Sequence, residues 1–217
     1  MSPSEIKKEL LQDFDWIHNM RNGWNKKYRK RLQLKYSEDL TILEHKMYKS
    51  PLHNNVHCFF GCKQRHKWNE LVWWLVWEVL TFGGKKRYII FDILYGKYTL
   101  VTPHAVERMQ ERSGKTFLEM FEENIKSSTR GTISWLYYKG RFSDELMGKF
   151  GNGFLLGCDD AFGNSIAKTY VSNSMQFENQ AYLVNKSVEH SEALYKDDCN
   201  EFHSRKYKRE NYVKVSA

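Results

Sequence analysis

The sequence has few of the residues that stiffen loops or cross-link small folds. Its 217 residues include three prolines and four cysteines, Cys58, Cys62, Cys158 and Cys199. Four cysteines are too sparse for the disulfide framework of a small secreted protein. A chain of this length can also bury a core without such cross-links. We therefore expect reduced thiols and a cytoplasmic protein.

Long apolar runs and nucleotide-binding fingerprints are missing as well. The longest apolar stretch, residues 71–82, is too short to cross a bilayer and contains Glu78. The N-terminal residues include acidic side chains and lack the apolar centre of a signal peptide. No P-loop or dinucleotide-binding fingerprint is found. These absences argue against a membrane partner and against a bound cofactor.

Positive charge and aromatic rings are abundant. Lys and Arg number 34 against 26 for Asp and Glu, which gives a net charge of +8, and aromatic residues make up 15%. An excess of positive charge indicates an anionic partner and says nothing about the fold. The rings either fill a core or remain exposed to stack on bases.

One segment concentrates the positive charge. Residues 21–35 hold seven cations and no acidic residue. Its candidate nucleic-acid-binding residues are Arg21, Trp24, Lys26, Lys27, Tyr28, Arg29, Lys30 and Arg31. The cations would hold phosphates while Trp24 and Tyr28 stack on bases of RNA or another nucleic acid. A solvated helix face or a contact between subunits would explain the same run.

The order of elements predicts an α+β fold with an antiparallel sheet packed by helices. Hydrophobic periodicity and turn residues predict helices and strands along most of the chain. Helices are expected at residues 4–20, 37–50, 102–114, 115–125 and 175–195, strands at 71–82, 88–96, 97–102, 132–138, 153–158 and 165–172, and irregular structure at 52–67. We expect a basic helical extension at residues 1–50 and a core domain at 51–217, centred on 85–190.

The helix expected after Thr102 and Pro103 has one polar stripe. His104, Arg108 and Arg112 are spaced four residues apart and fall on one side of this helix. Guanidinium groups can hold a phosphate, and an imidazole can transfer a proton near neutral pH. The stripe is therefore a candidate for RNA cleavage without a metal. Neighbouring glutamates could pair with the same cations and make an ordinary charged helix face.

The segment HAVERMQERSG at 104–114 resembles the HA-x-x-R-M-x-x-R-x-G opening of a bacterial toxin-like family. This family is related to the BrnT ribonuclease toxins and, more distantly, to proteins of the RelE-type fold. The later segment GFLLGCDDAFGNSIAKTYVS at 153–172 resembles the family's closing strands. The resemblance covers residues 98–175 and finds no counterpart for the N-terminal half.

The resemblance implies a RelE/BrnT-like core and a metal-independent endoribonuclease. His104 would act as general acid or base, and Arg108 and Arg112 would hold the phosphate. Lys168 would stabilise the transition state, with Tyr170 close to the same site. A toxin of this type would also have a protein antitoxin or inhibitor as its partner.

Two further clusters and one other function remain open. His57, Cys58, Cys62 and His66 could supply zinc ligands, although the spacing C-x3-C-x3-H is outside the commonest pattern. Buried free cysteines and surface histidines would explain the same residues. Asp159 and Asp160 are either turn residues or part of a metal site. The alternative to an enzyme is a phage- or defence-related protein that binds nucleic acid or protein through a basic, aromatic surface.

Overall fold

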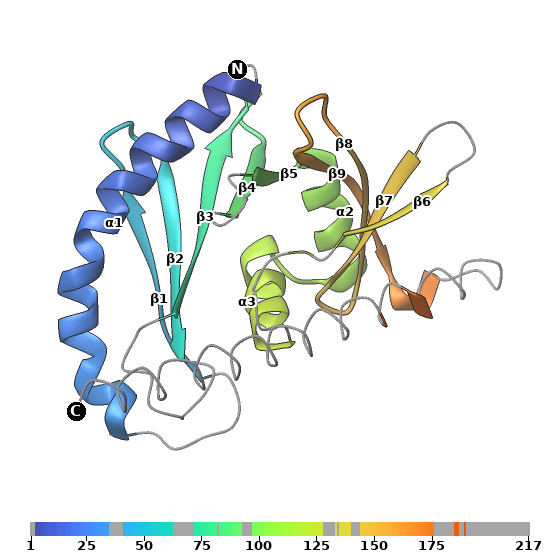
Figure 1. The fold of residues 1–217 in the computed structure, drawn as a ribbon. Helices are drawn as coiled ribbons and strands as arrows, with labels where there is room; N and C mark the ends of the chain where they lie inside the picture. Colours follow the sequence, from blue (N-terminus) through green and yellow to red (C-terminus); the bar gives the residue numbers. More distant parts are fainter. Residues whose placement is uncertain are drawn as a thin grey trace, which may run out of the picture.

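The computed structural model describes residues 3–34, 41–62, 72–81, 83–92, 97–127, 133, 135–139, 144–175, 185–186 and 189 (Figure 1). These residues form a nine-stranded sheet, three α-helices and a short 3-10 helix. The protein is therefore of the α+β class.

The helices are α1 (Pro3–Leu34), α2 (Pro103–Ser113) and α3 (Phe117–Ser127), and the 3-10 helix is η1 (Asn173–Met175). The strands are β1 (Thr41–Lys49), β2 (Asn55–Cys62), β3 (Val72–Leu80), β4 (Lys86–Asp92), β5 (Lys97–Val101), β6 (Trp135–Lys139), β7 (Asp144–Phe150), β8 (Gly153–Asp159) and β9 (Ser165–Ser172).

The sheet consists of two antiparallel meanders joined by one parallel pair. Its strand order is β1-β2-β3-β4-β5-β9-β8-β7-β6. Strands β5 and β9 run parallel, with Leu100 opposite Ile166, and every other described neighbour pair is antiparallel. The expected antiparallel sheet is thus a mixed one. Helices α2 and α3 follow β5 in the chain, within the long connection that returns to β9.

Helix α1 covers one face of the first meander (Figure 1). Ile6, Leu10, Ile17 and Trp24 recur at helical spacing and are buried. They share a core with side chains from four strands: Val56, Cys58, Phe60, Leu75, Trp77, Ile89, Phe91 and Tyr98. Burying each large side chain stabilises the fold by about 1.5–3 kcal/mol. Helix α1 therefore shares its core with the sheet.

The other face of the sheet packs on α2 and α3, and both meanders curve around these helices (Figure 1). Phe117 of α3 stacks on Tyr88 of β4 and on Phe150 of β7, with ring centroids 4.3 and 5.5 Å apart. Ala105 and Met109 of α2 are fully buried in the same core. One apolar cluster thus connects the two meanders through the helices.

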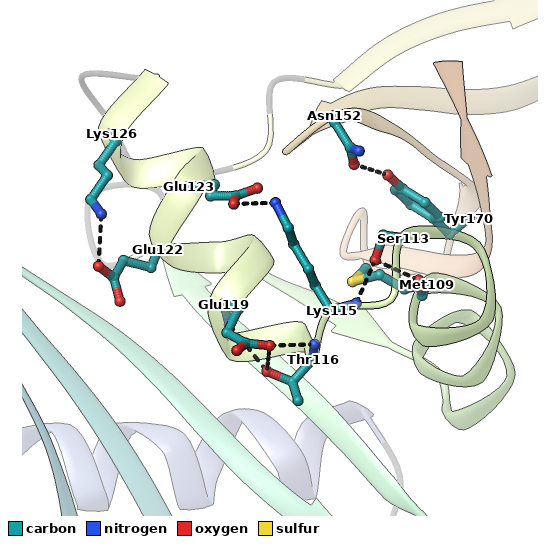
Figure 2. Close-up of polar contacts among 10 residues, drawn as sticks. All are labelled: Met109, Ser113, Lys115, Thr116, Glu119, Glu122, Glu123, Lys126, Asn152 and Tyr170. Carbon is teal, nitrogen blue, oxygen red and sulfur yellow. Dashed lines mark hydrogen bonds and ion pairs between the residues drawn. The ribbon is translucent and has the colours of Figure 1, made fainter. Parts of the chain in front are cut away.

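Local capping signals set the ends of α2 and α3. The Thr102 hydroxyl accepts a hydrogen bond from the Ala105 amide at 3.3 Å, and Gly114 ends α2 with a φ of 69°. Thr116 and Glu119 form a capping box at the start of α3 (Figure 2). The predicted starts and ends of both helices are confirmed to within about two residues.

Three strands differ from the sequence-based prediction. The helix expected at 37–50 is wrong, because residues 41–49 form β1 and pair with β2. Residues 55–62 form β2 instead of irregular structure, and β7 was not expected. Both faces of β2 are buried, so its sequence lacks the alternation that marks a strand. Most of the helix expected at 175–195 lies outside the described residues.

Candidate functional site: the α2–β9 corner and a buried histidine network

The start of α2 is hydrogen-bonded to β9. The Thr102 amide donates to the Ala167 carbonyl at 3.1 Å, and the Thr102 hydroxyl donates to the Lys168 carbonyl at 3.3 Å. His104 follows two residues later and is exposed, as is the Lys168 side chain. The structure therefore places the backbone segments that carry His104 and Lys168 against each other. We call this region the α2–β9 corner.

A β-bulge presents Lys168 at this corner. Leu156 of β8 pairs with Thr169, and the next residue, Gly157, pairs with Ala167, so Lys168 has no opposite residue. A Cβ atom on Gly157 would lie 2.0 Å from the Ile166 carbonyl oxygen. Only glycine permits this close approach of the two strands. Bulges of this kind change the direction of a side chain.

Two of the predicted catalytic residues have structural roles instead. The Tyr170 ring is fully buried, and its hydroxyl donates to Asn152 Oδ1 at 2.7 Å (Figure 2). Burial raises the pKa of Tyr170 to about 12. Arg112 donates to the Tyr170 carbonyl oxygen and so fixes the end of α2 to β9. Tyr170 was expected to act close to His104 and Arg108, but its ring is buried in the core and out of reach of a substrate.

The remaining charges on α2 are paired at the surface. Arg108 lies 2.8 Å from Glu111, and Glu107 lies 2.8 Å from Lys85 in the turn after β3. Hydrogen bonding and charge from Lys85 lower the pKa of Glu107. Such exposed pairs are weak and exchange readily with solvent or ligand. The corner therefore has His104 and Lys168 exposed, and Arg108 follows His104 by about one turn of α2.

The predicted nucleic-acid-binding residues lie in one continuous helix. The Trp24 ring is buried and contacts Phe60 and Tyr48, with centroids 4.8 and 5.3 Å away. Its predicted role in stacking on bases is wrong, because its ring fills the core. Lys26 and Lys27 are exposed. The side chains of Arg21, Tyr28, Arg29, Lys30 and Arg31 lie outside the described residues, although their backbone belongs to α1.

The zinc interpretation fails where it can be examined. His57 and Cys58 are adjacent on β2 and face opposite sides of the sheet, so they cannot bind one ion. Burial raises the pKa of the Cys58 thiol to about 12, which disfavours the thiolate that zinc requires. Among the described residues, no three His, Cys, Asp or Glu side chains could hold a metal. The Cys62 side chain and His66 lie outside that part.

Asp160 is a turn residue, as one of its two interpretations predicted. Its Oδ1 accepts hydrogen bonds from the amides of Phe162 and Asn164 at 2.8 and 2.9 Å. Its Oδ2 accepts from the Asn164 side chain at 2.9 Å. Burial works against ionisation, but these donors outweigh it and lower the pKa of Asp160. The carboxylate is therefore used within the β8–β9 turn.

A second polar cluster was not predicted. On the face of the sheet that packs α3, Glu78 Oε2 lies 3.5 Å from His57 Nε2, and His57 Nδ1 lies 3.1 Å from His45 Nε2. The Tyr88 hydroxyl and Lys86 Nζ each donate to Glu78 Oε2 at 3.2 Å. We call these three acid–base groups, in that order of contact, the Glu78–His57–His45 network.

Burial and charge set the protonation of this network. Burial lowers the pKa of His57 and of His45, although Glu78 and Glu122 respectively oppose the shift. Burial also works against ionisation of Glu78, but Lys86 and His57 outweigh it and lower the pKa of this carboxyl. Burial raises the pKa of Tyr88. At neutral pH the network therefore contains a carboxylate and two neutral imidazoles.

Sequence reasoning had one signal for this network. Glu78 is the single charge in the apolar stretch 71–82, and a buried charge needs partners. Those partners come from β1, β2 and β4, so no short spacing in the sequence links them. Strand pairing alone brings them together.

Comparison with known proteins finds no relative whose site could be compared with this one. The chain matches no protein-family model, no curated protein and no solved structure. The resemblance to the BrnT-related toxins therefore stays a prediction. In the part of the chain that the structure describes, no helix has the length and apolarity needed to span a membrane.

Proposed function

We propose that this protein binds RNA through the C-terminal half of α1. The observation that carries the proposal is the contrast between Trp24 and the residues that follow it. The Trp24 ring anchors the helix in the core, while Lys26 and Lys27 remain exposed. The helix continues through Leu34, so the cations of residues 21–31 belong to one continuous helix.

The charge distribution supports an anionic polymer as the ligand. Residues 21–35 contain no acidic side chain, and the whole chain has a net charge of +8. Lysines and arginines that neutralise phosphates release bound counterions, which makes affinity depend steeply on salt. A helix that carries several such residues in succession can contact several phosphates at once. The phosphate backbone would then provide most of the affinity, with little dependence on base sequence.

Replacing Lys26 and Lys27 by glutamine is expected to weaken RNA binding by about tenfold or more. The slope of log affinity against log salt should also fall by about 0.7 for each lost phosphate contact with a single strand. Fluorescence anisotropy with an RNA oligonucleotide, repeated over a range of salt concentrations, measures both quantities.

The matched control replaces Lys7 and Lys8, which are exposed on the same helix outside the basic run. Glutamine at these positions removes the same charge and should leave affinity and salt slope nearly unchanged. Equal losses in the two double variants would show that only net charge matters. Wild-type protein that binds no RNA at low salt would refute the proposal.

The second candidate function is RNA cleavage without a metal at the α2–β9 corner. It is supported by the bulge that leaves Lys168 exposed beside the helix start that carries His104. In this proposal His104 transfers a proton, while Arg108 and Lys168 bind the phosphate and its developing charge. Arg112 would act indirectly, because its hydrogen bond to the Tyr170 carbonyl oxygen holds β9 in place against α2. A protein antitoxin that covers this corner would inhibit such an enzyme.

If the α2–β9 corner is the site of cleavage, replacing His104 by alanine slows cleavage by about 100-fold or more, because general acid–base catalysis typically contributes that much. Cleavage of a labelled RNA and growth arrest on expression are the two measurements. The control is His18→Ala, which removes an exposed histidine from α1. Equal cleavage by wild type and the His104 variant would exclude this function.

A further inference from the structure

The side chains of the Glu78–His57–His45 network run from the buried core to the protein surface. The side chains of Glu78 and His57 are 9% and 7% exposed, whereas His45 is an exposed residue of β1. Glu78 Oε2 contacts Nε2 of His57, and Nδ1 of His57 contacts Nε2 of His45. In hydrolases a carboxylate likewise orients an imidazole, which takes a proton from a third group; here the third group is a second imidazole.

The order of contacts favours one arrangement of protons on the two rings. Glu78 Oε2 lies 3.5 Å from His57 Nε2 without forming a hydrogen bond, and its negative charge favours a proton on that nitrogen. With that proton in place, His57 Nδ1 would accept from His45 Nε2, which lies 3.1 Å away. A neutral imidazole carries one proton, so His45 Nδ1 would then have a free electron pair. The His45 ring is held by stacking on Phe59, with centroids 4.2 Å apart and planes within 3°.

The position of His45 connects this chain to the proposed RNA-binding helix. Strand β1 is the terminal strand of the described sheet, and Tyr48 on this strand contacts Trp24 of α1. His45 lies three residues before Tyr48, about 10 Å along the strand. Its ring lies on the opposite face, where Lys49 is also exposed. An RNA strand held by α1 would have to pass around the edge of β1 to reach His45, which lies on the opposite face of the sheet.

We propose that His45 is a general base that activates a ribose 2′-hydroxyl of RNA, with His57 and Glu78 as positioning residues. The inference rests on the RNA binding proposed above and is separate from the α2–β9 corner. Charged and titratable groups face the two imidazoles from every packed element: Glu78 from β3, Lys86 and Tyr88 from β4, and Glu122 from α3. Lys86 is ion-paired with Glu78, and Glu122 is ion-paired with Lys126, so His45 is the exposed imidazole of this network.

The reaction is an internal transesterification. His45 Nδ1 takes the proton of the 2′-hydroxyl, and the 2′ oxygen forms a bond to the adjacent phosphorus. The bond between phosphorus and the 5′ oxygen breaks, and that oxygen takes a proton from water. The hydroxide so formed recovers the proton from His45. The products are a 2′,3′-cyclic phosphate and a 5′-hydroxyl end, and no metal or oxidant takes part.

The test compares His45→Gln with Met47→Ala in the full-length protein. Met47 is exposed on the same face of β1 and has no group that takes a proton, so its replacement is the matched control. The substrate is a single-stranded RNA oligonucleotide, and mass spectrometry identifies cyclic phosphate ends. We expect His45→Gln to lose cleavage by about 100-fold or more and to bind RNA as the wild type does. The Met47 variant should cleave at the wild-type rate.

Two further measurements separate positioning from folding. His57→Gln keeps an oxygen that can accept from His45 Nε2 and should retain much more activity than His57→Leu, although both should fold. The wild-type rate should level off at a pH below 6.5, the ordinary pKa of histidine, because burial lowers the pKa of His45. RNA that is bound but not cut, or cut equally by His45→Gln, would overturn the inference alone. An absence of RNA binding would overturn the proposed function as well.

Discussion

The Asp13→Ala variant is expected to lose about 2–4 kcal/mol of the free energy of unfolding. Asp13 lies on α1 and is fully buried against the sheet. Its Oδ2 accepts hydrogen bonds from Trp77 Nε1 at 3.1 Å and from Asn54 Nδ2 at 2.9 Å. Alanine would leave both donors without this acceptor, and a buried donor without a partner costs more than the bond contributes. One carboxylate thus connects α1 to β3 and to the turn between β1 and β2.

Urea unfolding followed by tryptophan fluorescence measures this loss. The matched control is Asp15→Ala, which removes the same charge from the same helix at an exposed position. We expect the control to change stability by less than about 0.5 kcal/mol. Similar losses in both variants would mean that helix charge, and not the buried hydrogen bonds, explains the effect.

Replacing Gly157 by alanine should have a comparable or larger effect, with a loss of at least about 2 kcal/mol. The added Cβ would lie 2.0 Å from the Ile166 carbonyl oxygen and 2.9 Å from its carbon. These atoms belong to the backbone of the paired strand, so no side-chain rotation can relieve the contact. Strand β9 must move away from β8, and the bulge at Lys168 must change with it.

The same unfolding measurement applies, with Gly83→Ala as the control. A Cβ at Gly83 would have no neighbour within 4 Å, and its backbone does not adopt a positive φ. This variant should therefore be neutral or slightly stabilising. A Gly157 variant of wild-type stability would show that the bulge tolerates a side chain.

Where the chemistry is local, the sequence predicts the structure well. Thr102 and Pro103 begin α2, and Gly114 ends it, because capping depends on residues within a few positions. The apolar stretch that contains Trp74 and Trp77 was correctly predicted as a strand, and the hairpin of β4 and β5 was also correct. The α+β class follows from the order of these elements.

Where pairing between distant segments decides, prediction fails. Leu43 and Met47 have helical spacing, yet residues 41–49 form strand β1, which pairs with β2. Trp24 has basic neighbours that suggest an exposed ring, but Phe60 and Tyr48 bury it. Tyr170 was predicted from resemblance to lie close to the catalytic site, but its ring is buried in the core. Whether a side chain is buried depends on how distant strands and helices pack together, so a short stretch of sequence cannot predict it.

The parallel pairing of β5 and β9 has a consequence for the order of assembly. Strands β1 to β5 each pair with the strand next to them in the chain, so they can form as the chain leaves the ribosome. The partners that join β5 to β9 and its turn, such as Tyr98 and Asn164, are separated by 66 residues. Closing so long a loop is slow. Until β9 arrives, the edge of β5 exposes unpaired backbone groups, and the growing chain is most prone to aggregate at that stage.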